Sequence, residues 1–207
     1  REDGGYPFSR ATIARIVDAI AEAGPKAIGL DILLVDRGPE PGDQALEQAL
    51  RSNPTVIGEA AVFGSSSQVL DRDGAVLSDI PRADRFLMPL PRFEDASVIG
   101  VVNVTADQVG VPRSVPMVFS DGERIELSFP LRLAALAERA EPSVGPDGVR
   151  LSGRVVPTDI GHALPLAFLG PAGTIRTVSA ADLLDGKIEP GAFAGRMRLP
   201  LEVLEAV

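Results

Sequence analysis

The sequence predicts an α/β fold: a three-layer sandwich with a mostly parallel central sheet, extended by hairpins. Two observations lead to this class. Amphipathic helix patterns alternate with nearly continuous apolar runs, which are typical of strands buried on both faces of a parallel sheet. Further along the chain, short apolar segments flank an Asp-Gly turn, which favours an antiparallel hairpin.

The first expected helix covers residues 9–23. Its apolar side chains repeat at the spacing of one helix face, Ser9 caps its start and Gly24-Pro25 ends it. A buried strand follows at 26–36. We expect a second helix capped by Asp43, and then a second buried strand at 55–63. Together these segments predict a β-α-β crossover preceded by a helix.

The middle of the chain is more polar. Residues 64–97 predict a long loop, with a small hairpin across Asp73-Gly74; loops of this length are uncommon unless they are functional or mobile. The remaining expected elements are a strand at 97–104, a hairpin of 115–119 with 124–128, a helix at 128–140 with Pro130 in its first turn, a linker at 145–148, strands at 151–156 and 164–169, and a short helix from Ser179.

Composition limits the function classes. The chain of 207 residues has no cysteine, which excludes disulfide scaffolds, thiolate metal sites and cysteine nucleophiles. Its 20 Lys and Arg against 29 Asp and Glu give a net charge of −9, which disfavours nucleic-acid binding. No apolar stretch reaches the roughly 18 residues that a membrane span needs. We therefore expect a single soluble domain over residues 1–207.

Asp31 is the most suggestive single residue, because it interrupts an apolar strand near the edge where parallel sheets bind ligands. Asp36 and Asp43 follow within a dozen residues. One interpretation of these acids is a metal site or a general acid/base pair. The alternative is structural: Asp31 accepts hydrogen bonds from backbone or arginine, and Asp43 caps its helix. The pattern favours the structural interpretation.

The stretch GVVNVTADQVGVPRSVPMVF holds a second candidate set, Asn103, Asp107 and Arg113. Either these side chains converge on a polar ligand, or they bond turn backbone and an acid. The single histidine, His162, is expected in a surface turn. Motifs for nucleophilic catalysis, dinucleotides and P-loops are absent. We assign no catalytic residue, metal or cofactor, and the ligand-binding candidates are Asp31, Asp36, Asn103, Asp107 and Arg113.

A series of stretches runs in order from about Tyr6 to Arg196: YPFSRATIARIVDAIAEAGPKAIGLDILLVD, DQALEQAL, GVVNVTADQVGVPRSVPMVF, SFPLRLAALA and LPLAFLGPAGTIRTVSAADLLDGKIEPGAFAGR. Their order and spacing resemble the second type of CHASE domain, the cyclase/histidine kinase-associated sensing extracellular domain. The positions that look like the family pattern are Pro7, Arg10, Asp31, Asp43, Asn103, Asp107 and Gly110. The segment after Arg196 departs from it, because Arg198 and Pro200 interrupt an apolar strand, so 197–207 is either a native continuation or a join across missing residues.

The resemblance implies a non-catalytic, extracytoplasmic sensor domain of a bacterial transmembrane receptor. Family members are usually preceded by one membrane span and followed by several. Their cytoplasmic outputs include nucleotide cyclases, histidine kinases and Ser/Thr kinases. We expect a homodimer in the full receptor, at the periplasmic or extracellular face of the membrane. The resemblance names no ligand, so the signal is either a small molecule or a periplasmic protein.

Three hypotheses follow. In the first, a stimulus repacks the sensor domain, and the helix at 9–23 couples that change to membrane helices. In the second, the chain is a metal-dependent hydrolase centred on Asp31, Asp36 and Asp43. In the third, a periplasmic protein is the signal and docks on the polar segment 64–97.

Overall fold

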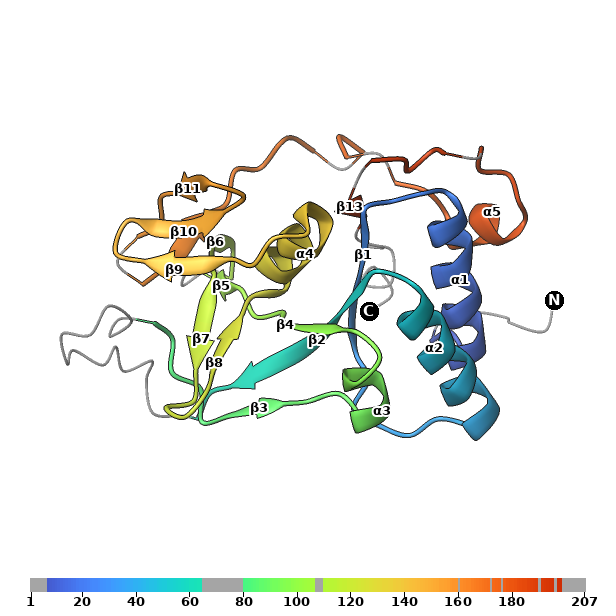
Figure 1. The fold of residues 1–207 in the computed structure, drawn as a ribbon, viewed down its shortest axis with the longest axis horizontal. Helices are drawn as coiled ribbons and strands as arrows, with labels where there is room; N and C mark the ends of the chain where they lie inside the picture. The colour runs from blue at the N-terminus through green and yellow to red at the C-terminus, as the bar shows by residue number, and fades with distance from the viewer. Residues whose placement is uncertain are drawn as a thin grey trace.

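The computed structural model describes residues 7–64, 80–106, 110–159, 161–171, 173–175, 177–189, 191–195 and 197–198 (Figure 1). Its helices are α1 (Arg10–Glu22), α2 (Glu40–Ser52), α3 (Pro91–Glu94), α4 (Phe129–Glu138) and α5 (Ala180–Leu184). Its strands are β1 (Ala27–Leu33), β2 (Thr55–Val62), β3 (Arg85–Leu87), β4 (Val98–Val101), β5 (Thr105–Ala106), β6 (Pro112–Pro116), β7 (Val118–Ser120), β8 (Ile125–Leu127), β9 (Ser143–Gly145), β10 (Gly148–Leu151), β11 (Arg154–Val156), β12 (Ala163–Pro165) and β13 (Met197–Arg198).

The largest sheet has the order β13-β1-β2-β3, with β4 also paired to β2. Strand β1 lies parallel to β13 and to β2, and β2 lies parallel to β4, whereas β3 is antiparallel. The β1-α2-β2 crossover predicted from the sequence is therefore confirmed. The short pairing of Met197 and Arg198 with β1 also shows that the chain rejoins this sheet edge near its C-terminal end.

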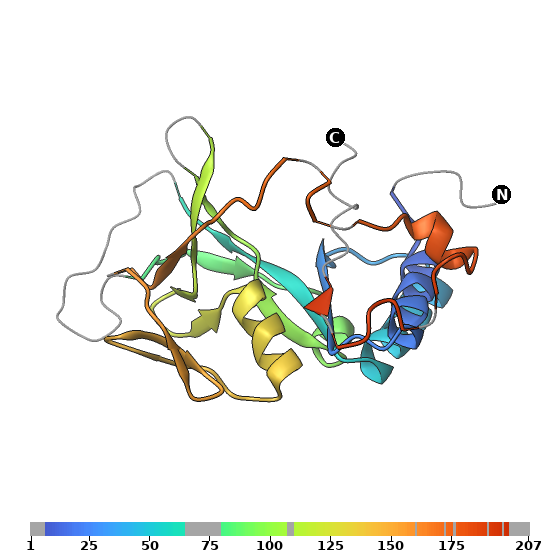
Figure 2. The same ribbon diagram turned by 90° about the horizontal axis from the view of Figure 1, so that it is seen from above.

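Alternate side chains of β1 pack against different helices, as the period of a strand requires. Ile28 and Leu30 join the core cluster that includes α1 and α2. Gly29 lies against α4 on the other face, where an added Cβ would come 2.9 Å from the Phe129 ring. Helices thus cover both faces of β1 (Figure 2).

The prediction of a mixed α/β fold is confirmed, but the three-layer sandwich with a mostly parallel central sheet is not. Outside the largest sheet, the described strands form three small antiparallel sheets, with the orders β11-β10-β9, β12-β6-β5 and β7-β8. Tight turns join β7 to β8, β9 to β10 and β10 to β11, so these neighbours pair antiparallel, because a parallel pair needs a crossover connection of roughly a dozen residues.

Several element predictions are confirmed. Ser9 caps α1 by accepting a hydrogen bond from the Thr12 N–H at 3.1 Å. The hairpin around Ser120-Asp121-Gly122 forms between β7 and β8, and α4 has its proline in the first turn. Ser179 caps α5 through the N–H of Ala181.

Other predictions were wrong at the level of single elements. Helix α2 begins at Glu40, three residues before Asp43, and its N-cap is Pro39. The expected linker at 145–148 is the turn between β9 and β10. The expected strand at 151–156 is divided by a turn in which Ser152 and Gly153 both have positive φ, of 50° and 76°. A Ser-Gly pair with this backbone matches the right-handed twist of the flanking strands.

The polar segment 64–97 is only partly described. Its expected hairpin at Asp73-Gly74 lies outside the described residues. Residues 80–97 were expected to be loop but contain β3 and α3, because Phe86 and Phe93 are buried and anchor these short elements. Among the described helices, none is long and apolar enough to cross a membrane.

Candidate functional site

A buried ion pair joins the start of α1 to the first turns of α2. The side chain of Asp43 is 1% exposed. Its Oδ2 accepts a hydrogen bond from the Gly38 N–H at 2.9 Å, and Arg10 Nε lies 3.6 Å from its Oδ1. Arg92, which follows the first residue of α3, brings a second guanidinium to 3.9 Å from Oδ2. We call Arg10, Asp43 and Arg92 the arginine clamp.

Two glycines allow the clamp to form. A Cβ on Gly38 would lie 2.8 Å from Asp43 Oδ1, and a Cβ on Gly42 would lie 3.2 Å from the Cβ of Arg10. The loop after β1 and the first turn of α2 can therefore approach α1 closely. The N-terminal turns of a helix also favour a negative charge, which suits Asp43 to this position.

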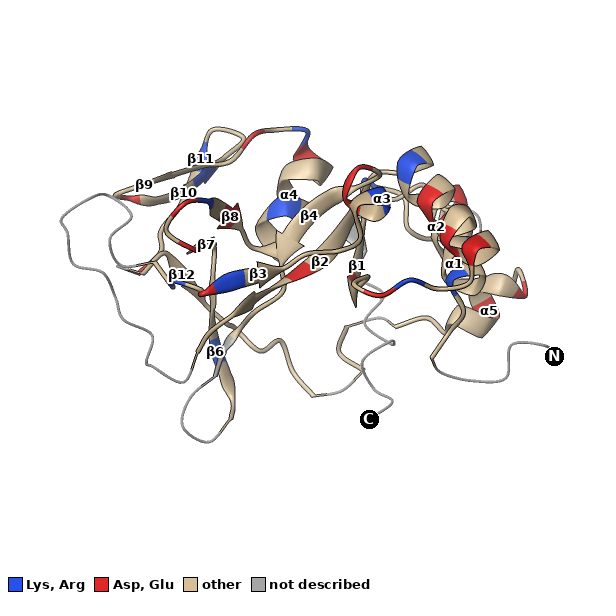
Figure 3. Ribbon diagram, turned by 90° about the horizontal axis from the view of Figure 1, so that it is seen from below, with Lys and Arg blue, Asp and Glu red and all other residues tan. Residues whose placement is uncertain are grey.

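Arg92 extends the clamp over the surface of α2. Its Nη1 and Nη2 donate to Glu40 at 3.0 and 2.8 Å, and its Nε donates to Glu47 at 3.1 Å. These hydrogen bonds lower the pKa of both glutamates. Figure 3 shows the acidic positions of α2 beside the basic position of α3.

Arg10 completes the connection between elements. Its guanidinium carbon lies 5.6 Å from the centroid of the Phe93 ring, and its Nη2 donates to the backbone carbonyl of Asp36 at 3.2 Å. The clamp therefore ties α1, the loop after β1, α2 and α3 to one another at the C-terminal end of β1.

The structure does not gather Asp31, Asp36 and Asp43 into one acidic site. Asp31 is half-buried on β1, where burial raises the pKa of its carboxyl, and it receives no hydrogen bond or ion pair from the described residues. Asp36 is exposed and contributes its backbone carbonyl. In the described part of the chain, no group of three His, Cys, Asp or Glu side chains is placed to hold a metal ion.

Asn103 acts as an extension of β4. Its Oδ1 accepts the N–H of Ala61 at 2.7 Å and its Nδ2 donates to the Ala61 carbonyl at 2.9 Å, so its amide replaces the next residue of a strand. Arg113 lies exposed on β6, away from the clamp. Asp107 lies outside the described residues.

Glu59 is a candidate that the motif search missed. It lies in the middle of β2, its side chain is 0% exposed, and neither carboxylate oxygen has a hydrogen-bond partner among the described residues. Burial, reinforced by the negative charge of Glu126, raises the pKa of this carboxyl to about 7. The signal in the sequence was an acid inside the apolar run TVIGEAAVF, the same signal that drew attention to Asp31.

His162 was expected on the surface, and that prediction was wrong. It lies in a turn, as expected, but is 4% exposed and has a positive φ of 55°. Its N–H donates to the Asp159 carbonyl and its own carbonyl accepts the N–H of Met117, so the turn is fastened to the end of β6.

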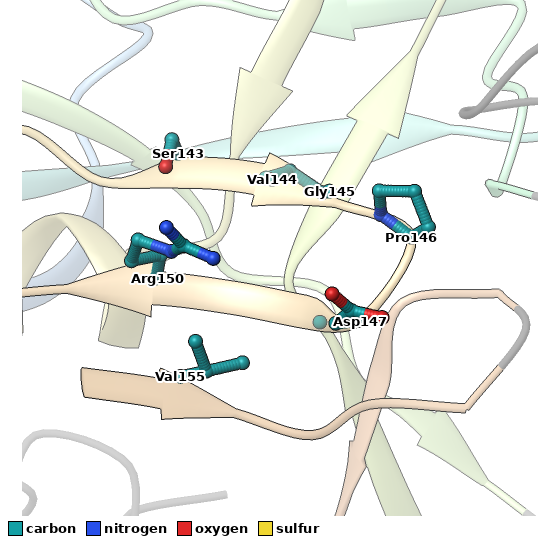
Figure 4. A pocket seen from close by; sticks show the side chains of 8 residues that line it. Ser143, Val144, Gly145, Pro146, Asp147, Arg150 and Val155 are labelled. Carbon is teal, nitrogen blue, oxygen red and sulfur yellow. The ribbon is translucent and has the colours of Figure 1, made fainter. Parts of the chain in front are cut away.

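A small cavity of about 100 Å³ lies in the β9-β10-β11 sheet, beside the side chains of Asp147 and Arg150 (Figure 4). It includes none of the ligand-binding candidates predicted from the sequence. The cavity is therefore not a meeting point for these residues.

The comparisons with known proteins give one result. The family model of the CHASE2 domain matches residues 1–199. No curated protein and no solved structure matches the chain.

Proposed function

The chain belongs to the CHASE2 domain family, and on this basis we propose that it is the extracytoplasmic sensory domain of a bacterial transmembrane receptor. CHASE2 domains are extracellular sensing domains of cyclase and kinase receptors, and they are not catalytic. The single observation that carries the proposal is the family match over residues 1–199 of 207. The proposed output is a nucleotide cyclase, a histidine kinase or a Ser/Thr kinase in the cytoplasm.

We place the coupling element at α1. Family members usually have a membrane span before the domain, so α1 is the first element that such a span would move. The arginine clamp fastens α1 to α2 and α3, and Ile16, Val17 and Ile20 bury its apolar face. A signal that loosens the clamp can therefore shift α1 against α2, which is the kind of change that biases membrane helices.

The hydrolase hypothesis has no comparable support. Two guanidinium groups lie beside Asp43, where the hypothesis requires a metal ion. A metal ion at Asp43 would be repelled by these two positively charged groups and would have to displace both of them. We therefore retain the sensor function alone.

The signal and the partners remain proposals. The signal is a small molecule or a periplasmic protein, and the receptor functions as a homodimer held by flanking membrane spans. Asp31, Asp36, Asn103, Asp107 and Arg113 remain the proposed ligand-binding residues. A ligand of Asn103 would have to replace its two hydrogen bonds to Ala61.

The location is tested by cysteine labelling in intact cells that express the full-length protein. The chain has no cysteine, so each introduced thiol is a unique label within the domain. A membrane-impermeant maleimide is expected to label Glu123→Cys, at an exposed position in the β7-β8 turn, without cell lysis. The control is Ala61→Cys, whose position is 5% exposed. Labelling of Glu123→Cys only after lysis would contradict an extracytoplasmic domain.

A further inference from the structure

Glu59 lies between two apolar clusters of the core. The period of the strand places it on the same face of β2 as Ile57 and Ala61. Ile57 belongs to the core cluster that includes α1 and α2. Ala61 belongs to a second cluster, with Phe86, Val101 and Phe119. A carboxylate in such surroundings needs a hydrogen-bond donor or a cation, because an unpaired buried charge is strongly unfavourable.

The described cations near Glu59 are already paired with other acids. The charged groups that act on it are Glu94 at the end of α3, Arg124 and Glu126 of the β7-β8 hairpin, and Arg132 of α4. Arg124 bonds Asp121 at 3.3 Å, and Arg132 lies 3.8 Å from Glu126. Arg124 and Arg132 are thus paired with other acids, and the negative charges of Glu94 and Glu126 make ionisation of Glu59 still less favourable.

We propose that Glu59 is a proton-binding site through which the domain responds to external pH, and that it keeps its proton while its side chain stays buried between the two core clusters. This inference rests on the proposed sensory function and names protons as a signal. When Glu59 loses its proton, water or a cation must reach the carboxylate, so the apolar residues that bury it must move apart. The Nε of Arg132, whose charge also acts on Glu59, is likewise buried without a hydrogen-bond partner among the described residues.

The sign of the pH effect follows from linkage. The folded chain holds the proton of Glu59 up to a pKa of about 7, whereas the unfolded chain releases it near 4.5. Between these values the folded state binds more protons, so stability falls as the pH rises. The loss is complete above pH 7.

The first experiment measures the thermal midpoint of the 207-residue chain and of Glu59→Gln from pH 4.5 to pH 8. The glutamine keeps the shape of the protonated side chain but cannot ionise. We expect Glu59→Gln to gain over the wild type by roughly 5 to 10 °C across this range, a size set by the pKa difference and the chain length. A constant difference between the two proteins would overturn the proposal.

A second variant keeps the test valid if Glu59→Gln does not fold. Burial is the main cause of the raised pKa of Glu59, and Glu126→Gln removes a negative charge that raises it further, so the midpoint of the pH transition is expected to move to lower pH. The matched control is Asp31→Asn, which removes another carboxyl of raised pKa on β1 and should leave this transition in place. A transition whose pH midpoint changes in Asp31→Asn but stays the same in Glu126→Gln would contradict the proton site.

The outcomes separate this inference from the proposed function. If the reagent labels Glu123→Cys in intact cells but the thermal midpoint shows no pH transition that depends on Glu59, the proton site is wrong and the extracytoplasmic location stands. If the thermal midpoint shows a pH transition that depends on Glu59 but Glu123→Cys is labelled only after lysis, the extracytoplasmic location is wrong and the proton site stands.

Discussion

Arg10 and Asp43 form an ion pair across the α1-α2 interface, with Nε 3.6 Å from Oδ1 and the carboxylate almost completely buried. Arg92 shares the same carboxylate at 3.9 Å from Oδ2. One acid thus lies between two guanidinium groups of different helices, and Arg92 is also paired with Glu40 and Glu47. This arrangement makes Asp43 the residue on which the attachment of α1 depends.

Replacing Asp43 with asparagine should destabilise the domain by about 3 kcal/mol, because it removes the buried carboxylate that pairs with Arg10 and accepts the Gly38 N–H. Chemical denaturation followed by circular dichroism measures the change. The control is Glu40→Gln, which breaks an ion pair of Arg92 at a side chain that is 73% exposed and should cost much less stability, because solvent screens an exposed pair. Equal effects of the two variants would show that the clamp is no stronger than a surface ion pair.

Gly100 should not tolerate a side chain. A Cβ at this position would lie 2.6 Å from the Phe129 Cα, so Gly100→Ala must push α4 away from β4. We expect a loss of about 1–3 kcal/mol in the free energy of unfolding, the usual range for overpacking. Gly145→Ala is the matched control, since a Cβ there meets no atom within 4 Å. Unchanged stability of Gly100→Ala would contradict the close contact between α4 and β4.

The amide of Asn103 should stabilise the fold through its two hydrogen bonds to the backbone of Ala61. Asn103→Ala leaves the N–H and the carbonyl of Ala61 without partners, which should cost about 1–3 kcal/mol. Thermal unfolding beside Arg154→Ala, an exposed position on β11, gives the comparison. If the arginine variant loses as much stability, the strand-like role of Asn103 is wrong.

The raised pKa of Asp31 predicts how its contribution to stability changes with pH. Burial raises the pKa of its carboxyl above the unfolded value of 3.8, so ionisation costs stability as the pH rises through this range. Asp31→Asn should therefore be more stable than the wild type at pH 7 and lose this advantage at pH 3. The measurement is urea denaturation at the two pH values. An advantage that grows at low pH would mean that Asp31 is stabilised as a carboxylate.

Local patterns predicted the elements near the N-terminus well. The spacing of Ile13, Ile16 and Val17 predicted α1, and the apolar runs predicted β1 and β2, because burial on both faces leaves a continuous signal. The clamp was not predictable in the same way. Arg92 lies far from Asp43 in the sequence, and the two meet only because α3 packs beside α2.

The short strands of the second half were harder to assign. The turn at Ser152-Gly153 requires positive φ at both residues, and a serine gives little sign of this. The ligand-binding role of Asn103 stays a prediction; the pattern shows a polar side chain after a strand but not its two hydrogen bonds to the backbone of Ala61. Glu59 was not proposed as a site residue, because its strand was predicted from the apolar run and the charge within that run was overlooked.

The central claim, that α1 transmits the signal, is tested most directly by locking α1 to α2 in the full-length receptor. Asn53 Nδ2 donates to Asp18 Oδ1 at 3.1 Å, so a short bis-maleimide can join Asp18→Cys to Asn53→Cys in a domain without other cysteines. The cyclase or kinase output is measured in membranes at pH 5.5 and pH 8, before and after crosslinking, with each single-cysteine variant treated as a control. We predict that the output differs between the two pH values before crosslinking and becomes fixed after it. A crosslinked receptor whose output and pH response are unchanged would contradict transmission through α1.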